Sequence, residues 1–188
     1  MNQYDYLKAF HDISREDYGL LEEKLRSKTF RKGDYIVVPG QTQRELYFVK
    51  SGVQISYFEA EAKMHVIAFT YPPNLCAIPE SFSFQKPSRY YLSCLSDSEL
   101  AYLTYEELQQ LFDRSPHIER LFRKATEAML AGVLSRHMEL HTTTIEERFR
   151  AFCRRSPHLL QLVPHKYIAS YLGMDATNFS KLYNSIKL

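Results

Sequence analysis

The hydrophobic positions of the chain follow two different spacings, and the change falls near Thr104. Before that residue, short runs rich in β-branched and aromatic residues are separated by turn-forming glycine and proline. Six of these runs are predicted to be strands: residues 35–38, 46–49, 53–58, 65–69, 91–94 and 100–103. Regularly spaced short strands are typical of an antiparallel β-sandwich or β-barrel. Ser14 and Asp17 mark the start of one short amphipathic helix ahead of them.

From Thr104 onward, apolar residues recur every three or four positions, which is the spacing of one face of an α-helix. Thr104 is followed by Glu107 at the capping-box position, and Pro116 can open a long helix that reaches about Leu140. A further helical segment is predicted from Thr144 to Arg155. Strands followed by helices predict an α+β fold.

The segment from Pro164 to Leu188 has the pattern of two short helices joined by a tight turn. A helix is predicted from about His165 to Leu172, Gly173 supplies the permissive backbone of the turn, and Asp175 can cap a second helix. The inner faces of the two helices carry the apolar residues Ile168, Ala169, Leu172, Phe179, Leu182 and Ile186. This is a helix-turn-helix pattern and predicts DNA binding. The alternative is an ordinary helical hairpin that closes a core.

The outer face of the second helix is polar, which favours the DNA-binding interpretation. It carries short hydrogen-bonding side chains and one cation that can meet base edges or phosphates: Thr177, Asn178, Ser180, Lys181 and Asn184. The chain has a formal net charge of +2. From Thr142 to Leu188 seven Lys or Arg residues stand against three acidic ones, whereas the remainder has seventeen against nineteen. The basic charge therefore lies with the predicted helix-turn-helix.

The long helix carries a stripe of mostly small residues at alternating steps of three and four. Its members are Ile118, Leu121, Ala125, Ala128 and Gly132. Such a stripe lets two helices approach closely, so we interpret it as a dimer seam, with Phe122, Met129 and Val133 on its flank packing on the sheet domain. The alternative is that both faces are buried against the same chain.

Several other classes of protein receive no support from the sequence. Three cysteines, Cys76, Cys94 and Cys153, lie far apart, so we expect free buried thiols and neither a disulfide nor a cysteine metal site. The longest apolar run, from Ala128 to Leu134, is far shorter than the ~18 residues of a membrane span. No signal-peptide pattern opens the chain. A cytoplasmic protein without a membrane partner is predicted.

Enzymatic interpretations are also poor. The sequence has no Gly-rich phosphate loop, no nucleophile elbow and no His-Glu-x-x-His motif. A cupin-type barrel needs a cluster of His and Glu, and the strand region offers only His65. His137 and His141 lie four apart on the long helix but have no evident third ligand, so we interpret them as solvent-facing or interface residues. We expect no enzyme, no metal site and no cofactor.

The order of these parts resembles the cyclic-AMP receptor protein/Fnr (Crp/Fnr) family of bacterial transcription regulators. The resemblance covers nearly the whole chain and rests on two motifs, "FRKGDYIVVPGQTQRELYFVKSGVQISYF" for the first strands and "YIASYLGMDATNFSKL" for the helix-turn-helix. It implies a cyclic-nucleotide-binding-like barrel, a double-stranded β-helix, over residues 1–115. It further implies a dimerisation helix over 116–141, and a DNA-binding domain over 142–188 that acts on double-stranded DNA as a homodimer.

The resemblance is weaker at the effector site. Family members that bind cyclic nucleotides have a Gly-Glu pair and, nine residues after the Glu, an Arg followed by small residues. Here Glu80 and Arg89 keep the spacing, but Pro79 replaces the glycine and two tyrosines replace the small residues. The expected effector pocket comprises Glu80, Ser81, Arg89, Tyr90, Tyr91, Leu130 and Ala131, the last two replacing the hydroxyls that the family's long helix offers to the base. We expect an effector other than cyclic AMP, or a pocket that is filled.

The DNA-reading helix departs from the family as well. Ala176 and Thr177 stand where the best-known members place an Arg-Glu pair, and Lys181 takes the position of a second Arg, so the operator sequence cannot be carried over. The sequence has no strand pair for a full wing, so phosphate contacts are expected from His165, Lys166, Tyr167 and the helix around 148–155. The competing hypothesis is a stand-alone small-molecule or protein-binding β-barrel with a degenerate helix-turn-helix.

Overall fold

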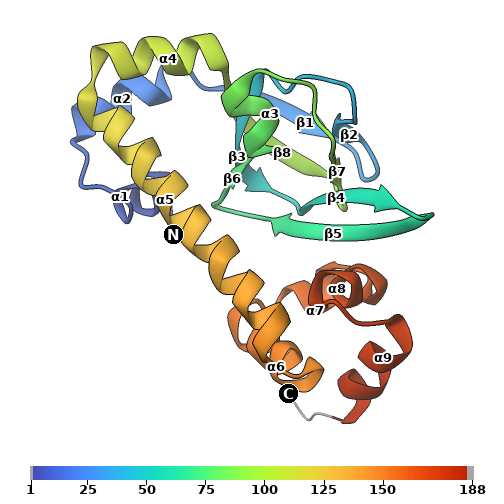
Figure 1. Ribbon diagram of the computed structural model, residues 1–188. Helices are drawn as coiled ribbons and strands as arrows, with labels where there is room; N and C mark the ends of the chain where they lie inside the picture. Colours follow the sequence, from blue (N-terminus) through green and yellow to red (C-terminus); the bar gives the residue numbers. More distant parts are fainter. Residues whose placement is uncertain (1, 186–188) are drawn as a thin grey trace. The chain divides into compact units, whose positions relative to one another are not determined.

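The computed structural model describes residues 2–185 and divides the chain into two compact units (Figure 1). The first unit comprises Met1–Ser56 and Phe69–Ala131, and the second comprises Tyr57–Ala68 and Gly132–Leu188. The boundary therefore lies inside one long helix, and a short stretch of the strand region belongs with the C-terminal helices.

The strands are β1 (Arg26–Phe30), β2 (Tyr35–Val37), β3 (Glu45–Ser51), β4 (Gln54–Ala60), β5 (Lys63–Thr70), β6 (Leu75–Cys76), β7 (Tyr91–Cys94) and β8 (Ser98–Thr104). The helices are α1 (Gln3–Lys8), α2 (Arg15–Glu22), α3 (Pro79–Phe84), α4 (Tyr105–Arg114), α5 (Pro116–Thr142), α6 (Ile145–Arg155), α7 (Leu159–Leu162), α8 (His165–Leu172) and α9 (Ala176–Ser185). The predicted α+β class is confirmed. Among residues 2–185, no helix is both long and apolar enough to cross a membrane.

The strands form two four-stranded sheets, in the orders β1-β8-β3-β6 and β2-β7-β4-β5. The central ladder pairs β3 with β8 in antiparallel fashion, from Glu45 opposite Thr104 to Ser51 opposite Glu99. Backbone hydrogen bonds do not close the two sheets into the expected barrel. Two of the edge strands, β2 and β6, have only three and two residues, and the β2–β7 register shifts, so little backbone is left for closure.

Gly52 makes the tight connection between β3 and β4 possible. Its φ angle is +87°, and a Cβ atom there would overlap the Asp97 carbonyl oxygen and Ser98. Glycine is therefore required for both conformation and space.

Buried residues of the first unit include two hydrophobic clusters. One cluster packs the helices on the β3–β8 ladder and includes Leu7, Leu21, Phe48, Leu103, Leu111, Ile118, Leu121 and Phe122. The other comprises strand residues and one residue next to α3: Val37, Tyr47, Val49, Cys76, Ile78, Leu92 and Leu100. All three cysteines are free and buried, and burial raises the pKa of the Cys76 thiol to about 12.

The burial of α5 residues differs from what the predicted dimer seam requires. Ile118 and Leu121 are 0% exposed in the core of their own unit, so they are not available to a second copy. Ala125 is half-buried, while Ala128 and Gly132 are exposed. Phe122 packs inside the core as expected, but the other flank residues, Met129 and Val133, are exposed. The large exposed hydrophobic residues of α5 are Met129, Leu130, Val133, Leu134, Met138 and Leu140. The small-residue stripe continues the inward face of the helix, which spacing alone did not reveal.

The second unit is built on α6 to α9. Three phenylalanines, Phe149, Phe152 and Phe179, are almost fully buried, and the Phe149 and Phe179 rings meet edge to face with centroids 5.3 Å apart. Helix α8 ends at Gly173, whose φ of +67° makes the predicted tight turn. Ile186, predicted on the inner face of the second helix, lies outside the described residues.

Candidate functional site

Helix α9 presents a polar face at helical spacing. Thr177, Ser180, Lys181 and Asn184 are all exposed, and their positions at i, i+3, i+4 and i+7 place them on one side of the helix. Phe179, on the opposite side, is 1% exposed and anchors the helix in the unit's core. Four of the five residues predicted on the polar outer face are therefore exposed, whereas the fifth, Asn178, is half-buried.

Asp175 and Asn178 form the cap of α9. The Asp175 carboxylate accepts hydrogen bonds from the Asn178 backbone N–H and from its side-chain amide, each at 2.7 Å. These two polar groups are thus engaged with each other. Both were expected at the DNA surface, as was Ala176, which is exposed at the first position of the helix.

His165 has a packing role that differs from the predicted phosphate contact. Its ring is half-buried, with its centroid 4.4 Å from that of Tyr183 and 4.9 Å from that of Phe179, and its Nε2 lies 3.3 Å from the Leu160 carbonyl oxygen. Lys166, by contrast, is exposed, and its ammonium lies 4.9 Å from the half-buried Tyr167 ring. Of His165, Lys166 and Tyr167, Lys166 therefore carries the exposed positive charge that a phosphate contact requires.

Arg148 is the residue whose position departs most from expectation. The basic helix around it was expected to face phosphates, yet Arg148 is 8% exposed. Its Nε donates to the Leu172 carbonyl at 3.0 Å, and its Nη1 donates to the carbonyls of Thr143 at 2.7 Å and Leu140 at 3.3 Å. One guanidinium therefore joins the C-terminal ends of α5 and α8.

A second cationic contact joins the same two helices. The Arg136 guanidinium lies 3.8 Å from the centroid of the Tyr171 ring, a cation–π contact. Burial lowers the pKa of Arg136 from its ordinary value. Arg155 lies 3.6 Å from the Glu139 carboxylate, and Arg150 pairs with Glu146 at 2.8 Å on the surface of α6. The helix-turn-helix is thus held to the end of α5 by charged groups.

Ser170 of α8 is hydrogen-bonded to the start of β5 in the β4–β5 hairpin, a contact that no sequence pattern indicates. Its hydroxyl donates to the Met64 carbonyl at 2.9 Å and accepts from the Val66 N–H at 3.0 Å. All three residues belong to the second unit. The strand region therefore contributes part of the unit that holds the helix-turn-helix.

In the predicted effector site, the polar groups satisfy one another. Glu80 and Arg89 form an ion pair at 3.0 Å, and this hydrogen bond is the main reason that the pKa of Arg89 is raised. Ser81 is completely buried, where it accepts from the Gln43 backbone N–H at 2.9 Å and donates to the Lys86 carbonyl at 2.7 Å. Ser81 is therefore a structural residue at the start of α3.

The two tyrosines after Arg89 are both half-buried and have different neighbours. Tyr90 is half-buried and packs against the strand cluster, and the Arg89 guanidinium lies 5.6 Å from its ring centroid. The Tyr91 ring lies 5.8 Å from the exposed Tyr35 ring. Tyr90 therefore occupies space beside the strand cluster where the family pattern has a small residue. The structure brings Glu80, Arg89 and Tyr90 together, whereas Leu130 and Ala131 are exposed on α5.

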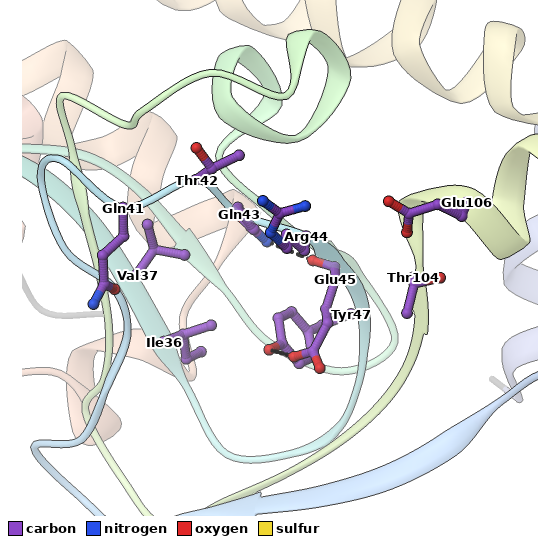
Figure 2. A pocket seen from close by; sticks show the side chains of 10 residues that line it. All are labelled: Ile36, Val37, Gln41, Thr42, Gln43, Arg44, Glu45, Tyr47, Thr104 and Glu106. Atoms are coloured by element: carbon purple, nitrogen blue, oxygen red, sulfur yellow. Dashed lines mark hydrogen bonds between the residues drawn. The ribbon is translucent and has the colours of Figure 1, made fainter.

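A cavity of about 350 Å³ lies beside the segment that leads into β3 (Figure 2). It is lined by Ile36, Val37, Gln41, Thr42, Gln43, Arg44, Glu45, Tyr47, Thr104 and Glu106, none of which was expected in the effector site. Figure 2 shows the hydrogen-bonded Glu45 and Tyr47 side chains together on one wall. Burial is the main reason that the pKa of Tyr47 is raised. Among residues 2–185, no three His, Cys, Asp or Glu side chains are grouped to hold a metal ion.

Comparisons with known proteins agree with this arrangement. Residues 27–115 match the cyclic nucleotide-binding domain family. FixK2 from Bradyrhizobium japonicum is 17% identical with a TM-score of 0.74, and the match covers 86% of this chain and 83% of FixK2. A regulator of the crp/fnr family from Eubacterium rectale is 15% identical, with a TM-score of 0.71 and coverage of 96% and 87%. The chain has the Crp/Fnr fold.

A third structure with the Crp/Fnr fold is the c-di-GMP responsive global regulator CLP of Xanthomonas campestris. It is 18% identical, with a TM-score of 0.68, and the match covers 92% of this chain and 91% of CLP. No curated protein sequence matches the chain significantly. The resemblance to Crp/Fnr regulators that the two sequence motifs indicated is thus confirmed.

Within this Crp/Fnr fold, we expect replacement of Arg148 by Met to loosen the helix-turn-helix. The change leaves three carbonyls without their donor, and each buried unpaired group costs about 1–3 kcal/mol. Urea unfolding should show a stability loss of at least about 2 kcal/mol. Arg150→Met is the matched control on the same helix, because its exposed pair with Glu146 contributes only about 0–1 kcal/mol. Equal losses of stability in the two variants would contradict the role of Arg148 in joining α5 to α8.

Proposed function

We propose that this protein is a homodimeric, sequence-specific DNA-binding transcription regulator of the Crp/Fnr type. The observation that carries the proposal is the exposed polar face of α9, held in place by the buried packing of Phe179 and by α8. In this proposal residues 1–115 form a sensor domain, 116–141 a dimerisation helix and 142–188 the DNA-binding domain. The proposal includes a cytoplasmic location, where such a regulator meets its operator. It includes no catalytic role.

The DNA interface that we propose centres on four exposed residues of α9. Thr177, Ser180 and Asn184 carry neutral hydrogen-bonding groups that suit base edges, and Lys181 adds a positive charge on the same side. Lys166 on α8 and Arg154 on α6 are exposed cations for backbone phosphates. Asp175 and Asn178 then act by fixing the start of α9 and so the direction of its exposed face.

The dimer interface that we propose lies on the exposed hydrophobic side of α5. Leu130 and Leu134 are 56% and 57% exposed, with Val133 and Met138 beside them. A run of large exposed hydrophobic side chains on one helix is costly in water unless it is covered. A second copy that packs its own α5 on this face would cover the exposed hydrophobic side chains of both copies. A two-fold dimer would also match a two-fold operator.

The effector that we propose is a small molecule other than cyclic AMP. A cyclic phosphate needs close donors, yet Arg89 is already paired with Glu80, and Pro79 provides no backbone N–H. Tyr90 packs on the strand cluster, where a small residue would leave room for the ligand. The cavity beside β3 has a mixed polar and apolar lining and is the alternative place for an effector.

The DNA-binding proposal predicts a loss of affinity when Lys181 is replaced by Ala. A selection from random or genomic DNA identifies bound sequences, and titration at several salt concentrations then measures the affinity. A phosphate contact predicts weaker binding to all sequences and a flatter salt dependence, whereas a base contact predicts relaxed specificity at one position, worth about 1–3 kcal/mol.

Lys32→Ala, which removes an exposed charge from the first unit, is the control and should leave DNA binding unchanged. A purified dimer that binds no DNA at low salt would contradict the regulator. If that dimer still bound a small molecule, it would identify a stand-alone binding module instead.

The dimer proposal predicts that Leu134→Glu yields a monomer. The change places a charge in the proposed apolar interface, where burial without a partner costs several kcal/mol. Ser135→Glu is the matched control, because Ser135 is exposed on another side of the helix. Sedimentation at micromolar concentration should separate the two variants. A wild-type monomer, or a Leu134→Glu dimer, would show that the interface lies elsewhere.

The effector proposal predicts no saturable heat when cyclic AMP or cyclic GMP is added at millimolar concentration in a calorimeter. Tyr90→Ser together with Pro79→Gly restores the small residue and the backbone N–H that the family pattern has, and should increase any residual binding. A micromolar dissociation constant for the unaltered protein would overturn the proposal.

A further inference from the structure

Two histidines stand next to each other near the C-terminal end of α5. His137 and His141 are both exposed, and their ring centroids are 4.5 Å apart at an interplanar angle of 63°. They are four residues apart, so both imidazoles project from the same side of the helix. An i, i+4 histidine pair on one helix face is also the arrangement by which a helix supplies two ligands to zinc.

The histidine pair extends the exposed hydrophobic face of α5 and forms with it a seam distinct from the small-residue stripe. Leu130, Leu134, His137 and His141 follow one another at steps of four, three and four, the spacing of a seam between two packed helices. Leu130 and Leu134 are more than half exposed. One turn before them, Glu127 is paired with Arg123 and Lys124 of the same helix. The seam thus has an apolar middle and ends in two imidazoles.

A parallel two-fold dimer through this seam brings each seam residue close to its own counterpart. The two histidines of one copy would then face the same two of the other, in successive layers about 6 Å apart along the helices. Four imidazoles that are removed from water need partners for their nitrogens, because an unpaired buried polar group is costly. A metal ion that binds one nitrogen of each imidazole meets half of that need and leaves the second ring N–H of each histidine to solvent.

We propose that the dimer binds one zinc-like divalent transition-metal ion between its two α5 helices, with His137 and His141 of both copies as ligands. This inference rests on the proposed dimer, because within residues 2–185 one chain groups no third ligand with the pair. Four nitrogens at about 2.0–2.1 Å from zinc form the tetrahedral site that this ion favours. The ion would join the helices two residues before Thr143, whose carbonyl accepts from Arg148.

The test is a zinc titration of the untagged full-length protein after removal of metal with a chelator. Calorimetry should give one zinc ion per two chains, and sedimentation should show a tighter dimer when zinc is present. His137→Ala and His141→Ala should each weaken zinc binding at least about 10-fold, since each removes two of the four ligands. His158→Ala, which removes an exposed histidine of α7's N-terminal side, is the control and should bind zinc as the unaltered protein does.

The outcomes test the metal site separately from the dimer on which it rests. A dimer that binds no zinc, or binds it equally well without His137 and His141, overturns the metal site and leaves the proposed function in place. A protein that is monomeric with and without zinc overturns both. Circular dichroism of the variants, expected to be unchanged because both histidines are exposed, separates a lost ligand from a lost fold.

Discussion

The C-terminal unit depends on one buried cation. Arg148 gives up most of its hydration, and the loss is offset only because three backbone carbonyls accept its N–H groups. Leu140, Thr143 and Leu172 lie at or just beyond the ends of α5 and α8, where helices present unpaired carbonyls and partial negative charge. A single planar donor therefore neutralises two helix ends at once and sets their separation. In the same unit Phe149, one residue after Arg148, packs against Phe179 of α9.

The helices of the C-terminal unit were predictable because their signals are local. Thr144 with Glu147, Gly173 and Asp175 each act within one turn of chain, and the structure contains all of these caps and turns. Strand β1 was not predicted because its residues are mostly exposed, which removes the alternation that identifies a strand. Helix α3 is not predictable from spacing because it has only six residues, and Pro79 at its start is equally typical of a loop. Short α1, α7 and β6 also lack a long enough pattern.

The candidate site was only partly predictable, and the missing part is non-local. Spacing identified Glu80 and Arg89 as effector-pocket residues, but it did not indicate that they pair with each other, that Ser81 makes buried hydrogen bonds, or that the His165 ring packs on Tyr183. The stripe on α5 illustrates the same limit. Helical spacing places Ile118 and Ala128 on one side, but only the rest of the fold decides that this side turns inward at Ile118. The contact of Ser170 with the β4–β5 hairpin joins residues more than one hundred positions apart, beyond the reach of any local pattern.

That contact also bears on aggregation. Strand β5 lies at the edge of its sheet, and an edge strand exposes backbone groups that can pair with a strand of another chain. The Ser170 hydroxyl on α8 hydrogen-bonds two of these backbone groups, the Met64 carbonyl and the Val66 N–H. The helix-turn-helix therefore also protects a sheet edge. A protein in which α8 is unfolded or removed would present β5 as a template for intermolecular β-pairing, so its solubility would depend on a domain that lies outside the sheet.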